Sequence, residues 1–260
     1  MILMDSKIDK ADAKVQKIRE QKRRKSSEDR KVGSEIFDKI TLETLYKLAN
    51  QDYLDVLNGA ISTGKEANVL KGITKDNNYV AVKIYRIATS DFKKMDYYVH
   101  GDPRFNIKTK NKRQLIYAWV NKEFKNLKRL YTAGVNVPEP IVNSNNVLII
   151  EFVGDDKGNP APPVKNQPPE DSEEFFNKLL VQLKKFVHGG KLVHGDLSNY
   201  NILNQNEEPL IIDVSQSVVL DNPISHELLQ RDIKTLVNEY KKLGVKTSYE
   251  EVYEYVDFKL

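Results

Sequence analysis

The 260-residue chain contains no cysteine, so a disulfide framework and a thiolate metal site are both excluded. It also lacks any apolar run approaching about 18 residues, the length that crosses a bilayer, and its first residues carry no signal-peptide core. Neither membrane insertion nor secretion is expected, and we predict a cytoplasmic protein. The length permits one large domain or two lobes around a cleft, with an ample core.

Basic and acidic residues nearly balance over the whole chain, since the net charge is only +4, but basic residues cluster near the start of the sequence. Residues 7–31 hold eleven Lys or Arg against five Asp or Glu, including the run Lys22-Arg23-Arg24-Lys25. Such a run is usually a solvated helix face and only sometimes a phosphate-backbone contact. We predict an N-terminal helical extension over residues 1–50, in which Thr41 is the N-cap of a second helix.

The most informative stretch of the sequence runs from residue 193 to residue 213. Asp196 precedes Asn201 by five positions, and Asp213 ends the next apolar run. In phosphoryl transfer one acid orients the attacking oxygen, while an amide and a second acid hold magnesium. The apolar residues on either side of the turn 204–208 predict a hairpin with Asn201 and Asp213 at the same end. Each residue alone is more often an ordinary loop residue, but the joint pattern H-x-D-x-x-x-x-N favours phosphoryl transfer.

Three strand-like segments precede this motif. They span residues 53–61, 67–73 and 79–85. Residues 59–66 nearly spell the phosphate loop G-x-x-x-x-G-K-[ST], but Glu66 replaces the hydroxyl residue and a strand follows instead of a helix. We predict a hairpin flap, with a plain turn as the alternative. In the flap, Ser62, Thr63 and Lys65 offer hydroxyl, backbone N–H and ammonium donors to phosphates.

The third strand places a lysine, Lys83, inside an apolar sequence, where it needs an anionic partner. An edge-strand lysine facing water is the alternative. Residues 112–132 predict a helix whose single carboxylate, Glu123, lies on its apolar stripe. An ion pair between Lys83 and Glu123 is therefore predicted. The polar stretch 89–110 between strand and helix is expected to be an inserted flexible loop.

A further apolar strand, residues 147–153, runs into Gly154 and is predicted to link two lobes. Backbone groups of Glu151 and Val153 would there face the edge of an adenine ring. Helical periodicity then predicts three more helices. They cover residues 173–188, residues 225–243 and a short stretch after Ser248.

The order of Lys83, Glu123, Asp196, Asn201 and Asp213 resembles that of the protein-kinase-like fold. The motifs S-T-G-K-E-A, H-G-D-L-S and I-D-V-S-Q-S together resemble the RIO family of atypical kinases, specifically its first subfamily. The similarity covers roughly residues 35–260. It implies an α+β fold with a small β-rich N-lobe over 51–153, interrupted by the loop at 89–110, and a truncated helical C-lobe over 154–260.

The resemblance also implies an activity. It implies ATP with Mg²⁺ or Mn²⁺, serine autophosphorylation, and a role in maturing the small ribosomal subunit, whose RNA and protein would be partners; no DNA partner is expected. The family is thought to act as an ATPase through a phosphorylated aspartate, which would map onto Asp213. Gly195 stands where kinases commonly have arginine, and Val214-Ser215 follows Asp213. Switching by a phosphorylated activation loop is therefore not expected.

Our mechanistic hypothesis assigns each motif a role. Lys83, held by Glu123, contacts the α- and β-phosphates; Asn201 and Asp213 coordinate metal; Asp196 orients or deprotonates the acceptor. One alternative is a small-molecule kinase of the aminoglycoside or choline type, where H-G-D is also common. Another is an ATP-gated ribosome-binding factor, with the basic cluster 22–25 and the loop 89–110 contacting RNA or protein.

Overall fold

The computed structural model describes residues 37–87, 90, 92–100, 102, 104 and 111–257. The predicted helix before residue 37 and its basic cluster lie outside these residues. The chain divides into two compact units. Among the described residues, unit 1 comprises those within 37–92, 111–120 and 141–152, and unit 2 comprises those within 93–104, 121–140 and 153–257. The domain boundaries predicted after residues 50 and 153 stay predictions.

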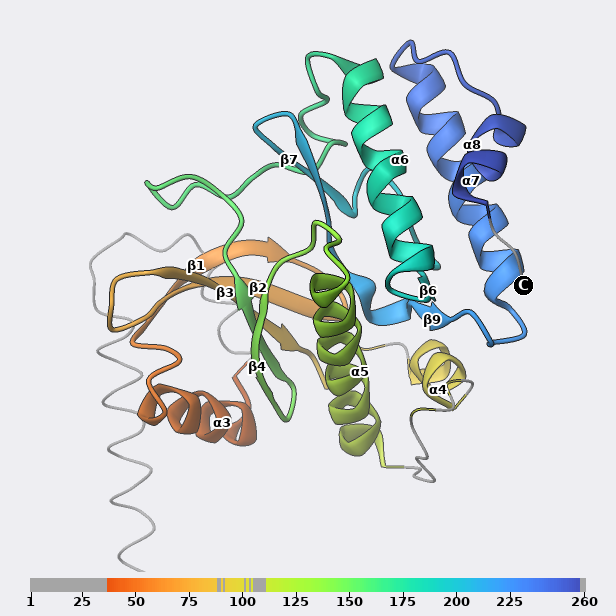
Figure 1. Ribbon diagram of the computed structural model, residues 1–260. Coiled ribbons are helices and arrows are strands. Elements are labelled where there is room, and N and C mark those ends of the chain that lie inside the picture. Colours follow the sequence, from red (N-terminus) through yellow and green to blue (C-terminus); the bar gives the residue numbers. More distant parts are fainter. Residues whose placement is uncertain are drawn as a thin grey trace, which may run out of the picture. The chain divides into compact units, whose positions relative to one another are not determined.

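Unit 1 is built on a five-stranded antiparallel sheet of order β1-β2-β3-β5-β4 (Figure 1). Its strands are β1 (Val56–Thr63), β2 (Ala67–Ile73), β3 (Tyr79–Tyr85), β4 (Pro140–Ser144) and β5 (Val147–Glu151). The predicted bounds of the second and third strands are confirmed. Strand β4 was not predicted, because its short sequence begins at a proline and lacks clear alternation.

The core of unit 1 forms between the sheet and helix α3 (Lys39–Asn50). Leu45 and Leu48 of α3 pack in one cluster with Val82 and Ile84 of β3. The prediction of Thr41 as N-cap is wrong. Asp38 is the N-cap, and its carboxylate accepts a 2.8 Å hydrogen bond from the Thr41 N–H, one of the amides in the first turn that have no partner within the helix.

Two helices follow β3 in the chain. Residues Phe92–His100 form α4, although the sequence analysis expected a flexible loop there. Met95, Tyr98 and Val99 of α4 are buried, at the three- and four-residue spacing of an amphipathic helix whose polar residues masked the pattern. Helix α5 (Lys112–Thr132) has the predicted bounds and belongs to unit 1 through residue 120 and to unit 2 from residue 121.

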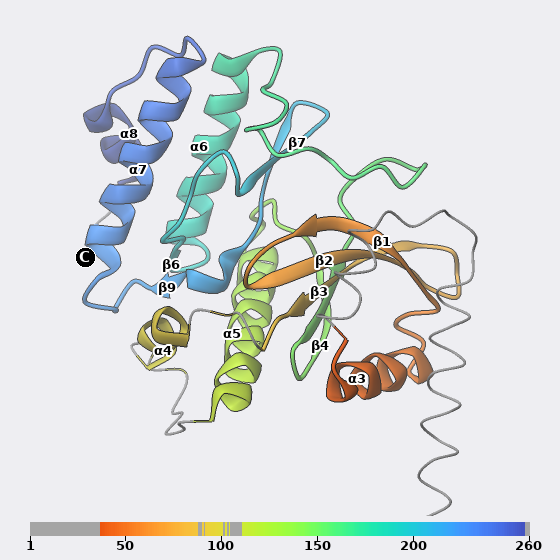
Figure 2. The same ribbon diagram turned by 180° about the vertical axis from the view of Figure 1, so that it is seen from behind.

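Unit 2 combines helices with short strand pairs. Helices α6 (Ser172–His188) and α7 (Ser225–Lys242) lie side by side in both views, and α8 (Tyr249–Val256) packs against them (Figures 1 and 2). The pairs are β6 (Leu192–Val193) with β9 (Val218–Val219), and β7 (Ile202–Gln205) with β8 (Glu208–Ile211). A single 3-10 turn, η1 (Val214–Gln216), follows β8. Among the described residues, no helix is long and apolar enough to cross a membrane.

Candidate functional site

The β7–β8 hairpin confirms the predicted placement of Asn201 and Asp213. Ile202 pairs with Ile211 in the antiparallel register, and the Ile212 N–H donates a 3.0 Å bond to the Asn201 carbonyl. Asn201 and Asp213 therefore flank the open end of the hairpin. Asp213 adopts the left-handed conformation with φ of 57°, and this turns the chain directly into η1.

Asp196 lies beside these two residues on the loop after β6. The Asn201 side-chain amide donates a 2.8 Å bond to the Asp196 carbonyl oxygen. The side-chain amide of Gln216 donates a 2.9 Å bond to Oδ2 of Asp196, whose side chain remains exposed. Asn201 thus fixes the backbone of Asp196, and Gln216 fixes its carboxylate. An oriented, solvent-accessible carboxylate is what a group that positions an acceptor hydroxyl requires.

His194 serves the site as a structural link. The buried ring accepts a 3.2 Å bond at Nδ1 from the Asp196 N–H, and Nε2 lies 3.1 Å from the Ile212 carbonyl. These two partners together call for a neutral ring with its proton on Nε2. The imidazole therefore joins the loop that carries Asp196 to the strand that leads into Asp213.

The loop after β6 is also fixed from α7 by Asp232, which the sequence analysis missed. Its buried carboxylate accepts a 2.7 Å bond from the Gly195 N–H and a 3.0 Å bond from the Leu197 N–H. Burial raises the pKa of Asp232, against the opposing effect of the two backbone bonds. Gly195 has φ of 80°, where a side chain would be strained, so glycine rather than arginine suits this position.

Asn201 and Asp213 supply the kind of donor that Mg²⁺ prefers, an amide oxygen and carboxylate oxygens. Because Nδ2 of Asn201 donates to Asp196, its Oδ1 is the atom suited to a cation. Oδ1 of Asp213 accepts a 3.0 Å bond from the Ser215 hydroxyl, which orients the carboxylate. No group of three His, Cys, Asp or Glu able to hold a metal occurs among the described residues. A pair of protein ligands nevertheless fits Mg²⁺, which is usually bound through one or two carboxylates and substrate phosphates.

The predicted lysine lies in unit 1. Lys83 is 9% exposed and belongs to β3, which pairs with β2 and β5, so the alternative of an edge-strand lysine is wrong. Its ammonium lies 5.1 Å from the centre of the Tyr85 ring. Glu123 is buried at 2% exposure in the part of α5 that belongs to unit 2. The ion pair between them stays a prediction.

The residues of the predicted flap lie on β1, β2 and the turn between them. Strands β1 and β2 form a hairpin in which the Gly64 N–H donates a 2.9 Å bond to the Ala67 carbonyl, and Ser62, Thr63 and Lys65 are exposed at its tip. The phosphate contacts of the flap stay predictions.

At the end of β5, Glu151 is exposed and Val153 is 8% exposed. The Val153 carbonyl accepts a 3.0 Å bond from the Ala161 N–H, so an adenine contact at this residue would use its N–H. The adenine contacts of both residues stay predictions.

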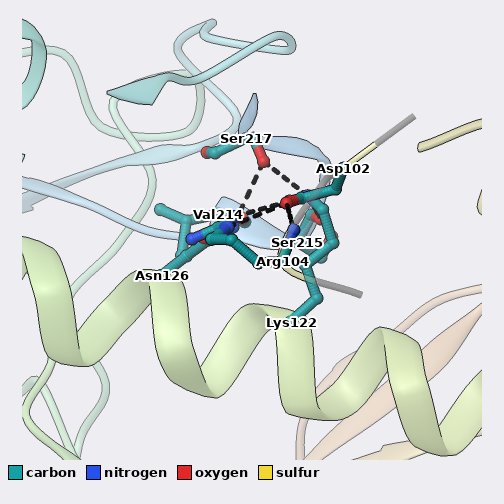
Figure 3. Close-up of polar contacts among 7 residues, drawn as sticks. All are labelled: Asp102, Arg104, Lys122, Asn126, Val214, Ser215 and Ser217. Carbon is teal, nitrogen blue, oxygen red and sulfur yellow. Dashed lines mark hydrogen bonds and ion pairs between the residues drawn. The ribbon is translucent and has the colours of Figure 1, made fainter. Parts of the chain in front are cut away.

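A second cluster missed by the sequence analysis surrounds η1. Lys122 and Asn126 of α5 bind backbone carbonyls of residues 214–217, and Arg104 and Asp102 extend the cluster (Figure 3). A signal was present, because Trp119, Lys122 and Asn126 recur on one face of the predicted helix and a polar pair on an apolar face needs partners.

Comparison with known proteins decides the family. The RIO domain model matches residues 68–253, more than half of the chain. This chain belongs to the RIO family. The "RIO-type serine/threonine-protein kinase Rio1" of Methanocaldococcus jannaschii is 43% identical over 94% of this chain and 83% of its own length. The protein of the same name from Haloferax volcanii is 40% identical over 90% of this chain and 80% of its own length. The predicted first subfamily is thereby confirmed.

More distant matches agree with this RIO assignment. The Homo sapiens "Serine/threonine-protein kinase RIO1" is 34% identical over 96% of this chain, which spans only 46% of the human protein. The crystal structure of the Rio2 kinase from Chaetomium thermophilum has a TM-score of 0.64 at 24% identity, over 82% of this chain and 67% of that one. It confirms the predicted kinase-like α+β fold of this RIO protein.

Proposed function

We propose that this RIO protein transfers the γ-phosphate of ATP to serine or threonine hydroxyls, including its own serine, and to water. The observation that carries the proposal is the joint geometry at the β7–β8 hairpin. Asn201 and Asp213 flank its open end, and Asp196 is held next to them by Asn201 and Gln216. The relatives named serine/threonine-protein kinases favour a protein acceptor over an aminoglycoside or choline.

In this mechanism the residues of unit 2 position the reacting oxygens. Asp196 accepts a hydrogen bond from the acceptor hydroxyl and receives its proton as the oxygen attacks the γ-phosphorus. Asn201 and Asp213 would hold the divalent cation, Mg²⁺ or Mn²⁺, which would supply neutralisation of the phosphate charge. Lys83, with Glu123 as its partner, is assigned to the α- and β-phosphates, and Ser62, Thr63 and Lys65 to the phosphates from the flap.

Hydrolysis is proposed to run through Asp213 itself. A carboxylate oxygen attacks the γ-phosphorus, the bond to the bridging oxygen breaks, ADP leaves, and water then cleaves the acyl phosphate. The solved Rio2 kinase "ADP/Mg2+-phosphoaspartate complex", with a TM-score of 0.63 and 22% identity, supports this route by analogy. Asp213 is suited to it because the Ser215 hydroxyl and the left-handed backbone fix its carboxylate.

A small ribosomal subunit precursor is the proposed partner. Its support is the subfamily, together with the basic run of residues 22–25, whose charge suits RNA. In the ATP-gated variant of this proposal, hydrolysis times release from the particle. Binding of the precursor should then weaken steeply with salt and differ between the ATP- and ADP-bound protein.

One assay tests the activity and separates its forms. Purified protein is given γ-labelled ATP with and without precursor particles, and both protein-bound and free phosphate are followed. Label that is acid-stable and resistant to hydroxylamine is phosphoserine or phosphothreonine, whereas hydroxylamine-labile label is an acyl phosphate on aspartate. Particle-stimulated free phosphate indicates an ATPase switch, and stoichiometric label on a ribosomal protein indicates a protein kinase.

Two variants tie the activity to the site. Asp196→Ala and Lys83→Ala should lower turnover by about 10²–10⁴-fold while circular dichroism stays unchanged. Lys75→Ala is the matched control, because Lys75 forms an exposed ion pair with Asp52. Near-normal turnover in either site variant would refute the assignment of that residue.

A further inference from the structure

A lysine buried in the body of unit 2 holds the backbone that follows Asp213. Lys122 of α5 has 0% exposure, and its ammonium donates to the Ser215 carbonyl at 2.9 Å and also to the Ser217 carbonyl. Figure 3 shows the side chain rising from the helix toward these two residues. Lysine is rarely buried unless its charge is compensated, so its location is a feature to be explained.

The residue one helical turn later completes the contact. The side-chain amide of Asn126 donates to the Val214 carbonyl at 2.9 Å and to the Ser217 carbonyl at 3.3 Å. A single 3-10 turn cannot satisfy its own last carbonyls, and these are buried away from water. Lys122 and Asn126 therefore provide donors for three carbonyls of the four-residue stretch 214–217, which we call the anchored segment.

An outer pair of residues orients Asn126. The Arg104 guanidinium donates a 2.9 Å bond to Oδ1 of Asn126, so that the amide nitrogen faces the anchored segment. Arg104 is held by Asp102 through bonds of 2.8 Å from Nε and 2.5 Å from Nη2. Burial of Asp102 opposes its ionisation, but the bonds from Arg104 outweigh burial and lower its pKa. The amide orientation of Asn126 is thus fixed by a charge-assisted pair.

The anchored segment in turn carries the side chains that orient both carboxylates of the site. Ser215 donates to Oδ1 of Asp213, and Gln216 donates to Oδ2 of Asp196. A displacement of the segment would therefore move the hydrogen-bond donors of both acids at once. Misplacement by about 1 Å can lower a reaction rate about 10²-fold.

Simple packing does not account for an amine at this position. Burial disfavours the charged form of Lys122 and lowers its pKa to about 7, yet the side chain contacts two backbone carbonyls. Methionine would fill much of the same volume without that cost, but it would leave the carbonyls of residues 215 and 217 without these donors. Holding the backbone, rather than filling space, is the role that matches the contacts.

We propose that Lys122 and Asn126 are positioning residues for phosphoryl transfer, which fix the anchored segment and, through Ser215 and Gln216, orient Asp213 and Asp196. This inference rests on the proposed function. It also implies that the segment after Asp213 is held in one conformation by the interior of unit 2.

The principal test compares Lys122→Met with Lys128→Met, a matched control on the exposed face of the same helix. With Lys122→Met, we expect kcat to fall by about tenfold or more and KM for ATP to change by less than about threefold at saturating Mg²⁺. Because Asp213 loses its fixed orientation, the Mg²⁺ concentration for half-maximal activity should rise by about threefold or more. Lys128→Met should leave all three unchanged.

Two readouts do not depend on turnover. Amide hydrogen exchange of a peptide covering residues 214–217 should be faster in Lys122→Met than in the control, with exchange in α8 unchanged. Calorimetric ADP binding should lose part of its enhancement by Mg²⁺. A lysine that only stabilises the fold would lower the melting temperature without moving the Mg²⁺ requirement or this local exchange.

Milder variants keep the proposal testable if Lys122→Met does not fold. Asn126→Ala and Arg104→Gln should shift the Mg²⁺ requirement in the same direction by smaller factors. Unchanged exchange and unchanged Mg²⁺ requirement in the folded variants would overturn the inference. If the wild-type protein itself neither transfers nor hydrolyses phosphate, the proposed function fails, while exchange and Mg²⁺-dependent ADP binding still decide whether the segment is anchored.

Discussion

The flap at residues 62–66 and the anchored segment at residues 214–217 are similar in sequence and opposite in environment. Both are short, polar and rich in hydroxyl groups, and both adjoin residues assigned to phosphate or metal. The flap exposes Ser62, Thr63 and Lys65 at the tip of a hairpin, whereas every residue of the anchored segment is buried. If the flap binds phosphates as proposed, its exposed side chains can adapt to a nucleotide, whereas the anchored segment carries the side chains that orient two carboxylates.

The two regions differ in which groups satisfy the hydrogen bonds of their backbone. At the flap, the Gly64 N–H bonds to the Ala67 carbonyl within the hairpin itself, and the Glu66 carbonyl accepts a 2.8 Å bond from the backbone N–H of Arg86, the residue after β3. In the anchored segment, the carbonyls depend on side chains of a helix about 90 positions earlier. The anchored segment is therefore tied to buried side chains of α5, whereas the side chains of Ser62, Thr63 and Lys65 are exposed at the hairpin tip.

The largest effect on stability is expected from removing the buried carboxylate that holds the loop carrying Asp196. Asp232→Ala removes the acceptor for the Gly195 and Leu197 amides, and each buried amide left without a partner costs about 1–3 kcal/mol. The free energy of unfolding, measured by urea denaturation, should fall by about 2–5 kcal/mol. Glu227→Ala, at an exposed position of the same helix, is the control. A loss below about 1 kcal/mol for Asp232→Ala would contradict a structural dependence on this carboxylate.

An intermediate effect concerns pH and Lys122. Its pKa is lowered to about 7 in the folded protein, chiefly by burial, with Asp102 and Glu123 favouring the charged form and Arg104 opposing it. Between this value and the ordinary value of 10.5, the unfolded chain binds more protons than the folded chain, so stability rises with pH.

The comparison with Lys122→Met isolates this contribution. Relative to that variant, the free energy of unfolding of the wild-type protein should increase by about 1–3 kcal/mol from pH 7 to pH 9. Urea denaturation of both proteins across this range provides the measurement. A difference that is flat or falls with pH would mean that the amine stays charged in the folded protein.

The smallest effect is expected at the flap. Replacing Ser62, Thr63 and Lys65 together by Ala removes only exposed donors, whose interactions are weakened by solvent. KM for ATP should rise by no more than about tenfold, with kcat within about twofold and the melting temperature unchanged. A loss of kcat comparable to that of Lys122→Met would show that the flap is as fixed as the anchored segment, and the contrast between the two regions would fail.

Much of the fold could be predicted because its signals are local. The apolar alternation of residues 67–73 and 79–85 and the helical periodicity of 112–132 gave the observed bounds. The exceptions have physical causes as well. Helix α4 was missed because charged residues stand between its apolar residues and obscure the helical spacing. Thr41 was chosen as N-cap although Asp38 is the stronger acceptor.

The sequence alone predicted the residues of unit 2 to which the chemistry is assigned. The placement of Asn201 and Asp213 at the same end of a short hairpin is a local property, since one tight turn brings them together, and Asp196 lies only five residues before Asn201. The tertiary structure decided what holds them. Asp232, Lys122 and Asn126 act on backbone groups 35 to 95 positions away. A polar residue on an apolar helix face shows that it needs a partner, but backbone carbonyls and amides are the same in every sequence, so the pattern does not say which of them it binds.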